Sequence, residues 1–165
     1  MYKLIATDMD GTLLNSQSII PEKNIEAIKL AKRKGAKVIL CTGRPITGVR
    51  DFAKILGLTD KGDYAITQNG AIIYDSFTNE IISSNLLSKK DILNFYKFSQ
   101  NNNLELHFCY NNKLITPAKE ISFHTIQEAY LCNIAISVIN NIEDISNDIC
   151  PSSITLVVEN EKTII

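Results

Sequence analysis

Two aspartates, Asp8 and Asp10, directly follow the apolar run of residues 2–7, in the segment Asp8-Met9-Asp10-Gly11-Thr12-Leu13. An unpaired carboxylate at the end of a strand beneath helices is costly, so two of them mark a site of concentrated negative charge. Mg²⁺ suits such a site, because it takes carboxylate and carbonyl oxygens and keeps several waters. Gly11 allows a sharp turn that lets backbone amides approach an anion. The segment therefore predicts a functional Mg²⁺ site beside an anion.

Two further polar segments follow apolar runs in the same way. Thr42-Gly43-Arg44-Pro45 comes after residues 38–41, and Gln68-Asn69-Gly70 comes after residues 64–67. In open α/β sheets, ligands bind beyond the carboxyl ends of the strands. We therefore expect these two segments and the acidic segment to meet at one edge of a sheet.

The elements that must position these segments alternate between strand and helix. The apolar runs show no polar alternation, which is typical of strands buried on both faces of a parallel sheet. Apolar residues at helical spacing lie between the runs, first Ile25, Ile28 and Ala31, then Ile46, Val49, Ala53 and Leu56. This order predicts βαβ units and an α/β fold. Asn69-Gly70 indicates a turn, and residues 71–74 and 80–83 are expected to extend the sheet as a hairpin.

Two other phosphate or metal motifs do not fit. In an EF-hand loop glycine is the sixth residue, whereas Gly11 is the fourth from Asp8. Gly43 and Gly48 have P-loop spacing, but Val49 and Arg50 stand where a P-loop needs Lys and Ser or Thr.

The second half of the chain has a different texture. All seven glycines lie between Gly11 and Gly70. Ser88 and Asp91 fit a capping box that starts a helix ending near residues 101–103. Strands are expected at residues 104–110, 133–139 and 154–158, and helices at residues 119–129 and 141–149. This α+β pattern predicts a domain boundary near residues 83–86. His107, His124 and Tyr110 are read as structural or surface residues.

Composition excludes several classes of protein. There are 17 Lys+Arg against 18 Asp+Glu, a net charge of −1, with 45% hydrophobic and 21% charged residues. These globular values with no basic excess argue against nucleic acid or a membrane surface as partner. The four cysteines form no CxxC pair, and we expect reduced thiols. No signal peptide or membrane span is expected, and we predict a cytoplasmic protein.

These motifs resemble those of haloacid dehalogenase-like phosphatases. Asp8-x-Asp10-Gly11-Thr12 looks like the family's first motif and Thr42-Gly43-Arg44-Pro45 like its second, while Gln68-Asn69-Gly70-Ala71 and Leu13-Leu14-Asn15-Ser16 point to the Cof-type subgroup. The resemblance implies a Rossmann-like parallel-sheet core with an inserted α+β cap of the C2 type. Residues 1–84 would be the N-terminal part of the core and residues 85–165 a partial cap.

The resemblance also implies roles for the site residues. Asp8 would be the nucleophile that forms an aspartyl phosphate, and Asp10 the general acid and base. Mg²⁺ would bind the Asp8 carboxylate and the Asp10 carbonyl. Thr42 and the Gly43 amide would hold the phosphoryl group. For Arg44 two interpretations stay open, substrate contact or a salt bridge at a helix start, and Asn69 either lines the site or only makes a turn. Thr12 would support its loop.

The family's third-motif lysine and fourth-motif acidic residues are not found in these 165 residues. We therefore expect core and cap to be incomplete, turnover to be impaired, and the incomplete core to favour self-association. The expected reaction is Mg²⁺-dependent hydrolysis of a small phosphorylated metabolite, such as a sugar phosphate. The alternatives are a phosphomutase or phosphotransferase, or a non-catalytic remnant that binds phosphometabolites or a partner.

Overall fold

The computed structural model describes residues 2–158. The chain divides into two compact units, Met1–Ser84 and Asn85–Ile165, where the glycine-rich half of the sequence gives way to the second half. No helix among the described residues combines the length and the apolar character that crossing a membrane requires.

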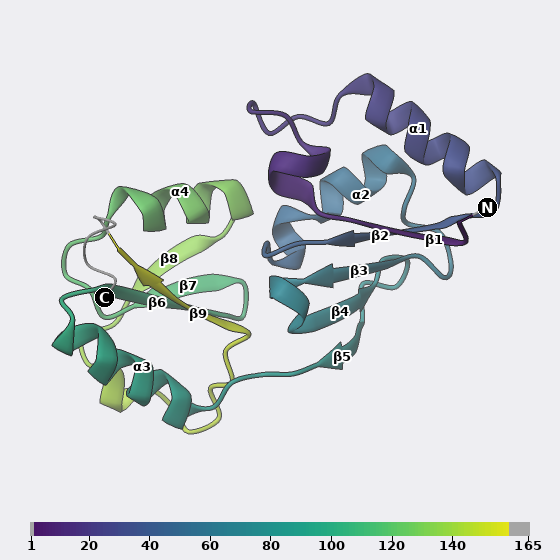
Figure 1. The fold of residues 1–165 in the computed structure, drawn as a ribbon. Helices are drawn as coiled ribbons and strands as arrows, with labels where there is room; N and C mark the ends of the chain where they lie inside the picture. Colours follow the sequence, from purple (N-terminus) through teal and green to yellow (C-terminus); the bar gives the residue numbers. More distant parts are fainter. Residues whose placement is uncertain (1, 159–165) are drawn as a thin grey trace. The chain divides into compact units, whose positions relative to one another are not determined.

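The first unit contains a five-stranded sheet with the order β1-β2-β3-β4-β5 (Figure 1). Its strands are β1 (Leu4–Thr7), β2 (Lys37–Cys41), β3 (Tyr64–Thr67), β4 (Ile72–Asp75) and β5 (Ile81–Ser84). The pairs β1–β2 and β2–β3 are parallel, as the alternation of strands and helices predicts. The pairs β3–β4 and β4–β5 are antiparallel, which confirms the predicted hairpin extension.

Two helices connect the parallel strands and lie on the same face of the sheet (Figure 1). They are α1 (Glu22–Arg33) and α2 (Arg50–Leu56), and α2 is preceded by a 3₁₀ turn, Ile46–Gly48. Gly57 ends α2 with a left-handed φ of +66°, a conformation that glycine adopts without strain. Beneath the helices, the sheet buries a core that includes Val38, Leu40 and Ala65.

The expectation that all the strands are buried on both faces is wrong for β1. Leu4 is 56% exposed and Ile5 is 37% exposed. The reason is topological, because among residues 2–158 β1 lies at the edge of the first sheet and pairs only with β2. Its sequence has the apolar character of a central strand, while its position leaves one edge of backbone groups unpaired by the sheet.

Lys32 ties α1 to the loop that follows α2. Its ammonium donates hydrogen bonds to Asp63 at 2.8 Å, to Asp60 at 3.0 Å and to the Gly57 carbonyl. Asp63 is only 2% exposed, so Lys32 is the cation that neutralises a buried carboxylate. Burial by itself lowers the pKa of Lys32, but the hydrogen bonds to Asp63 and Asp60 outweigh it and raise the pKa above its ordinary value.

The second unit contains a four-stranded sheet with the order β8-β7-β6-β9. Its elements are α3 (Lys89–Asn101), β6 (Glu105–Tyr110), β7 (Lys113–Thr116), α4 (Phe123–Cys132), β8 (Ala135–Val138) and β9 (Ser153–Val157). Ile92 of α3 packs with Leu106 and Phe108, whereas Ala129 of α4 packs with Cys109 and Leu114. Because neighbouring residues of a strand point to opposite faces, the two helices cover opposite faces of this sheet.

Most predicted elements of the second unit are present, with two exceptions. The capping box of Ser88 and Asp91 is formed at the start of α3. The predicted helix 141–149 is wrong, because only the 3₁₀ turn Ile142–Asp144 forms there. Strand β7 was not expected. It follows a two-residue turn in which Asn111 and Asn112 both have positive φ, the geometry of a tight hairpin.

His107 is buried within a polar network of the second unit. It is 1% exposed, with Nδ1 at 3.0 Å from Thr125 Oγ1 and Nε2 at 3.1 Å from Glu128. The Thr125 hydroxyl also donates to Glu105 at 2.7 Å, which links His107 to a second carboxylate. The structure thus gives His107 a structural role, as the sequence interpretation had it.

We predict that Lys32→Met lowers the free energy of unfolding by about 2 kcal/mol at neutral pH, because Asp63 stays buried without its cation. A group with a raised folded-state pKa stabilises fully below its unfolded-state pKa. That stabilisation is lost as pH rises through the folded-state pKa, so the difference between variant and parent should shrink in strong alkali. Urea unfolding over a pH series measures this. Lys29→Met on the same helix is the matched control, and an equal loss there would contradict the prediction.

We also predict that the open edge of β1 promotes self-association. Leu4→Lys places a charge on this edge strand and should reduce concentration-dependent association, measured by light scattering on a size-exclusion column. Leu30→Lys alters a similarly exposed leucine, 45% exposed on α1, and should have little effect. A parent chain that stays monomeric at every concentration, or association unaffected by Leu4→Lys, would contradict the prediction.

Candidate active site

The carboxyl ends of three strands meet at one edge of the first sheet. Thr7 of β1 pairs with Leu40 of β2, and Cys41 of β2 pairs with Ile66 of β3. The three parallel strands therefore end at nearly the same level. The segments that follow them begin at Asp8, Thr42 and Gln68, and they emerge side by side as the sequence predicts.

The acidic segment is anchored by the residue between its two aspartates. Met9 is 0% exposed in the core, while Asp8 and Asp10 on either side are exposed. Gly11 has φ of +73° and ψ of 0°, where a side chain would strain the backbone. The Leu14 amide donates to the Met9 carbonyl at 2.8 Å and closes the turn. One buried side chain and one glycine thus present two carboxylates to solvent.

Arg44 is bound to Asp10 by a two-point ion pair. Its Nε donates to Oδ2 at 2.8 Å and its Nη2 donates to Oδ1 at 2.6 Å. The Arg44 side chain is 6% exposed, against 52% for that of Asp10, and its guanidinium lies 5.5 Å from the centre of the Phe52 ring. Of the two open interpretations, the structure favours the salt bridge, because the guanidinium fork is directed at Asp10.

The second and third polar segments are joined by backbone hydrogen bonds. The Asn69 amide donates to the Thr42 carbonyl at 3.1 Å, and the Gln68 amide donates to the Arg44 carbonyl at 3.1 Å. The Thr42 hydroxyl accepts from the Arg44 amide at 3.2 Å, which leaves its own proton available to a ligand. The turn at residues 68–70 therefore fixes the shape of the Thr42 loop.

Gly43 leaves space that Asn69 occupies. A β-carbon built on Gly43 would lie 3.0 Å from Asn69 Oδ1, tighter than ordinary van der Waals contact. Gly43 itself is exposed, so an approaching ligand meets backbone here. Asn69 has a left-handed φ of +55° and thus combines a turn role with a place at the site.

The residues fit part of a metal site. Among residues 2–158, no group of three or more His, Cys, Asp and Glu side chains is placed to hold a metal ion. The exposed Asp8 carboxylate is the donor that a hard cation such as Mg²⁺ prefers, and the Asp10 carbonyl is a second candidate donor. The described residues therefore offer donor types that suit Mg²⁺, but not a full set of protein ligands.

The sequence interpretation missed two side chains at this site. Burial, followed by the negative charge of Asp8, raises the pKa of Cys41. Cys41 is the last residue of β2, and Thr7, the last residue of β1, pairs with the preceding Leu40, so the parallel register brings Cys41 close to Asp8. Phe52, which stacks on Arg44, carried no sequence signal beyond its place in the first turn of α2.

Comparisons with known proteins bear on this geometry. A family described as haloacid dehalogenase-like hydrolase matches residues 5–164. A Bacillus subtilis (strain 168) protein named "Putative phosphatase YxeH" is 40% identical over 149 residues, which are 90% of this chain and 55% of that protein. A second protein of that organism, 5-amino-6-(5-phospho-D-ribitylamino)uracil phosphatase YcsE, is 46% identical over 77 residues, which are 47% of this chain and 30% of that protein.

A solved structure from the same family has a similar fold. The crystal structure of a haloacid dehalogenase-like hydrolase from Bacteroides thetaiotaomicron has a TM-score of 0.73 at 28% identity, covering 88% of this chain and 55% of that one. The chain thus spans about half the length of YxeH and of this Bacteroides thetaiotaomicron hydrolase. The expected α/β Rossmann-like fold is confirmed, and the match over residues 5–164 shows that the chain belongs to the haloacid dehalogenase-like hydrolases.

Proposed function

We propose that this site hydrolyses phosphomonoesters of small metabolites through a phosphorylated Asp8. The observation that carries the proposal is the placement of an exposed Asp8 carboxylate at the sheet edge, next to the loop that presents the Thr42 hydroxyl and the Gly43 backbone. A carboxylate nucleophile beside a cradle of uncharged donors suits phosphoryl transfer, which depends mainly on positioning and on stabilising charge.

In the proposed reaction, an Asp8 oxygen attacks phosphorus while the bond to the leaving oxygen breaks. Asp10 gives its proton to that oxygen, so the alcohol leaves. Asp10 then takes a proton from a water molecule, whose oxygen attacks phosphorus and displaces the Asp8 carboxylate. Arg44 engages both Asp10 oxygens, but each carboxylate oxygen has a second lone pair for this exchange. Arg44 is thus a positioning residue.

Mg²⁺, when bound, would neutralise the charge that gathers between Asp8 and the phosphoryl oxygens. The chain's own contribution is the Asp8 carboxylate and the Asp10 carbonyl as ligands, and Thr42 and Gly43 as donors to the phosphoryl oxygens. Because the described residues offer only part of the metal shell, we propose that the 165-residue chain turns over slowly.

For the substrate, we propose a small phosphorylated metabolite such as a sugar phosphate. YcsE, by its name, acts on a compound with a phosphorylated ribityl group, which supports this class. We further propose that the second unit, residues 85–165, acts as a cap that reads the leaving group. Its support is that it forms a separate compact unit with its own α/β sheet.

The incomplete metal shell favours one alternative, a chain that binds phosphometabolites without turnover. Trifluoroberyllate mimics a phosphoryl group on aspartate, so its adduct separates these cases. An adduct at Asp8 without phosphate release would indicate a binding protein, while an adduct together with phosphate release supports the enzyme. For a phosphomutase or phosphotransferase, product analysis would show transfer between hydroxyls in place of free phosphate.

We predict that Asp8→Asn lowers phosphate release by about 100-fold or more, because an amide cannot serve as the nucleophile. Release of phosphate from a panel of sugar phosphates with Mg²⁺ measures the effect. Asp51→Asn, at an exposed aspartate of α2, is the matched control and should keep the parent rate. Equal rates for Asp8→Asn and the parent would refute the role of Asp8, and a fast family-like rate for the parent chain would refute slow turnover.

We predict that Asp8→Asn also speeds alkylation of Cys41. Removing the nearby negative charge lowers the pKa of the thiol, so the reactive thiolate fraction at a fixed, mildly alkaline pH rises a few fold. Mass spectrometry of iodoacetamide-labelled peptides measures each cysteine separately. Cys150 is exposed and serves as the internal control, with an unchanged rate. An unchanged rate at Cys41 would contradict the placement of Asp8 beside it.

A further inference from the structure

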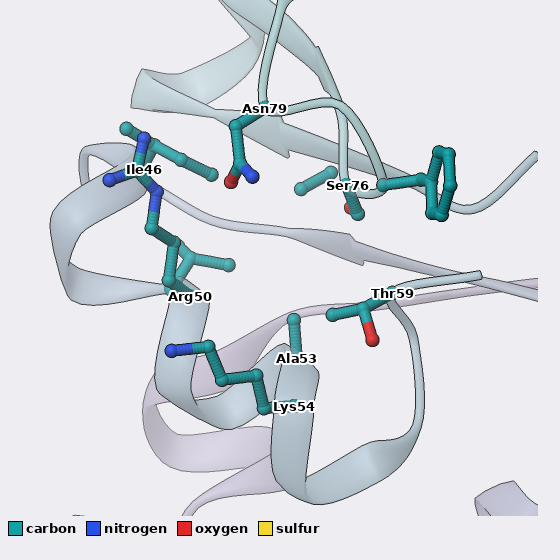
Figure 2. Close-up of a pocket in the computed structure, with 10 residues that line it drawn as sticks. Ile46, Arg50, Ala53, Lys54, Thr59, Ser76 and Asn79 are labelled. Carbon is teal, nitrogen blue, oxygen red and sulfur yellow. The ribbon is translucent and has the colours of Figure 1, made fainter. Parts of the chain in front are cut away.

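A pocket lies in the first unit between α2 and the turn that joins β4 to β5, apart from the candidate active site (Figure 2). Its volume is about 190 Å³. None of the residues proposed for phosphate chemistry lines it. The site therefore needs an explanation separate from the proposed function.

The floor of the pocket is apolar and its rim is polar. Val49, Ala53 and Ala65 form part of the floor, each less than 5% exposed. Arg50 and Lys54, one turn apart on α2, lie on the rim. Figure 2 shows the Asn79 side chain pointing from the β4–β5 turn toward α2, and the Arg50 side chain extending from α2 toward that turn.

The rim carries one net positive charge, that of Arg50. Lys54 is paired with Asp51 at 3.1 Å, so its charge is compensated. No hydrogen bond or ion pair joins the Arg50 guanidinium to another residue within the described part of the chain, residues 2–158. A guanidinium over an apolar floor matches a ligand with one planar carboxylate and a compact apolar body.

We propose that this pocket binds a small organic monocarboxylate. Arg50 pairs with the carboxylate, the amide of Asn79 donates to it, and the floor of α2 and β3 receives the apolar body. A cavity of this size suits about six to ten non-hydrogen atoms, since an engineered cavity of about 150 Å³ accepts benzene. A phosphate dianion suits the rim less, because only one of its two negative charges would be neutralised.

The test uses benzoate as the probe and uncharged benzamide, which has the same shape, as its control. In amide NMR titrations of the 165-residue chain, benzoate should bind saturably, with a dissociation constant of about 1 mM, typical of so small a ligand. Shifts should centre on Ala53, Ser76 and Asn79. Benzamide should bind at least about tenfold more weakly, because it lacks the charge that Arg50 recognises.

Variants separate this pocket from the rest of the surface. Arg50→Gln should weaken benzoate binding about tenfold or more, whereas Arg33→Gln on α1 should leave it unchanged. Ala53→Leu fills the floor and should remove binding. Asp8→Asn should leave benzoate binding unchanged, so the test of this pocket is independent of whether the proposed phosphatase activity is found. Equal affinity for benzoate and benzamide, unchanged binding in Arg50→Gln, or shifts that do not saturate would overturn the proposal.

Discussion

The parallel pairing of β1 with β2 and of β2 with β3 is the constraint on which the site depends. Parallel strands point their carboxyl ends the same way, so three loops distant in sequence must emerge together. Loop conformation then decides what each presents. The buried Met9 side chain anchors the first loop and leaves Asp8 and Asp10 exposed on either side, while Gly11 supplies the left-handed turn. The set of polar groups at this edge of the sheet thus follows from strand direction, and Met9 and Gly11 fix how the first loop presents its carboxylates.

The Asp10–Arg44 ion pair links two of these loops across the edge of the sheet. A buried guanidinium is tolerated when charged and aromatic groups compensate it, and the partners of Arg44 include the Asp10 carboxylate and the face of Phe52. Asp10 gains a fixed orientation from the same contact. Arg44 can therefore set the position of Asp10, the residue that is proposed to exchange protons.

Much of this arrangement could be predicted from the sequence, because short-range rules govern it. The apolar runs, the glycine at the end of α2 and the capping box at Ser88 each carry a local signal, and each element forms where that signal lies. Arg44 could not be assigned, since a salt bridge and a ligand contact have the same sequence. The exposure of β1 is also hidden, because an edge strand and a central strand differ in neighbours, not in residues.

Two errors in the second unit have different origins. Residues 141–149 have apolar residues at a spacing that suits a helix. The side chains of Asn141 and Ser146 instead accept hydrogen bonds from nearby backbone amides, and only single turns form. Strand β7 has only four residues and gains its place from pairing with β6 and β8. The first outcome depends on local hydrogen bonds from backbone to side chain, and the second on partner strands that lie elsewhere in the chain.

The close fit between Gly43 and Asn69 has a consequence for how related sequences can vary. A methyl group at position 43 would meet the amide oxygen at position 69, so the two sites share one small volume. A larger residue at one is compatible with the loop only if the other becomes smaller or turns away. Positions 43 and 69, far apart along the chain, should therefore change together among homologues, and this covariation would record the contact without any structure being known.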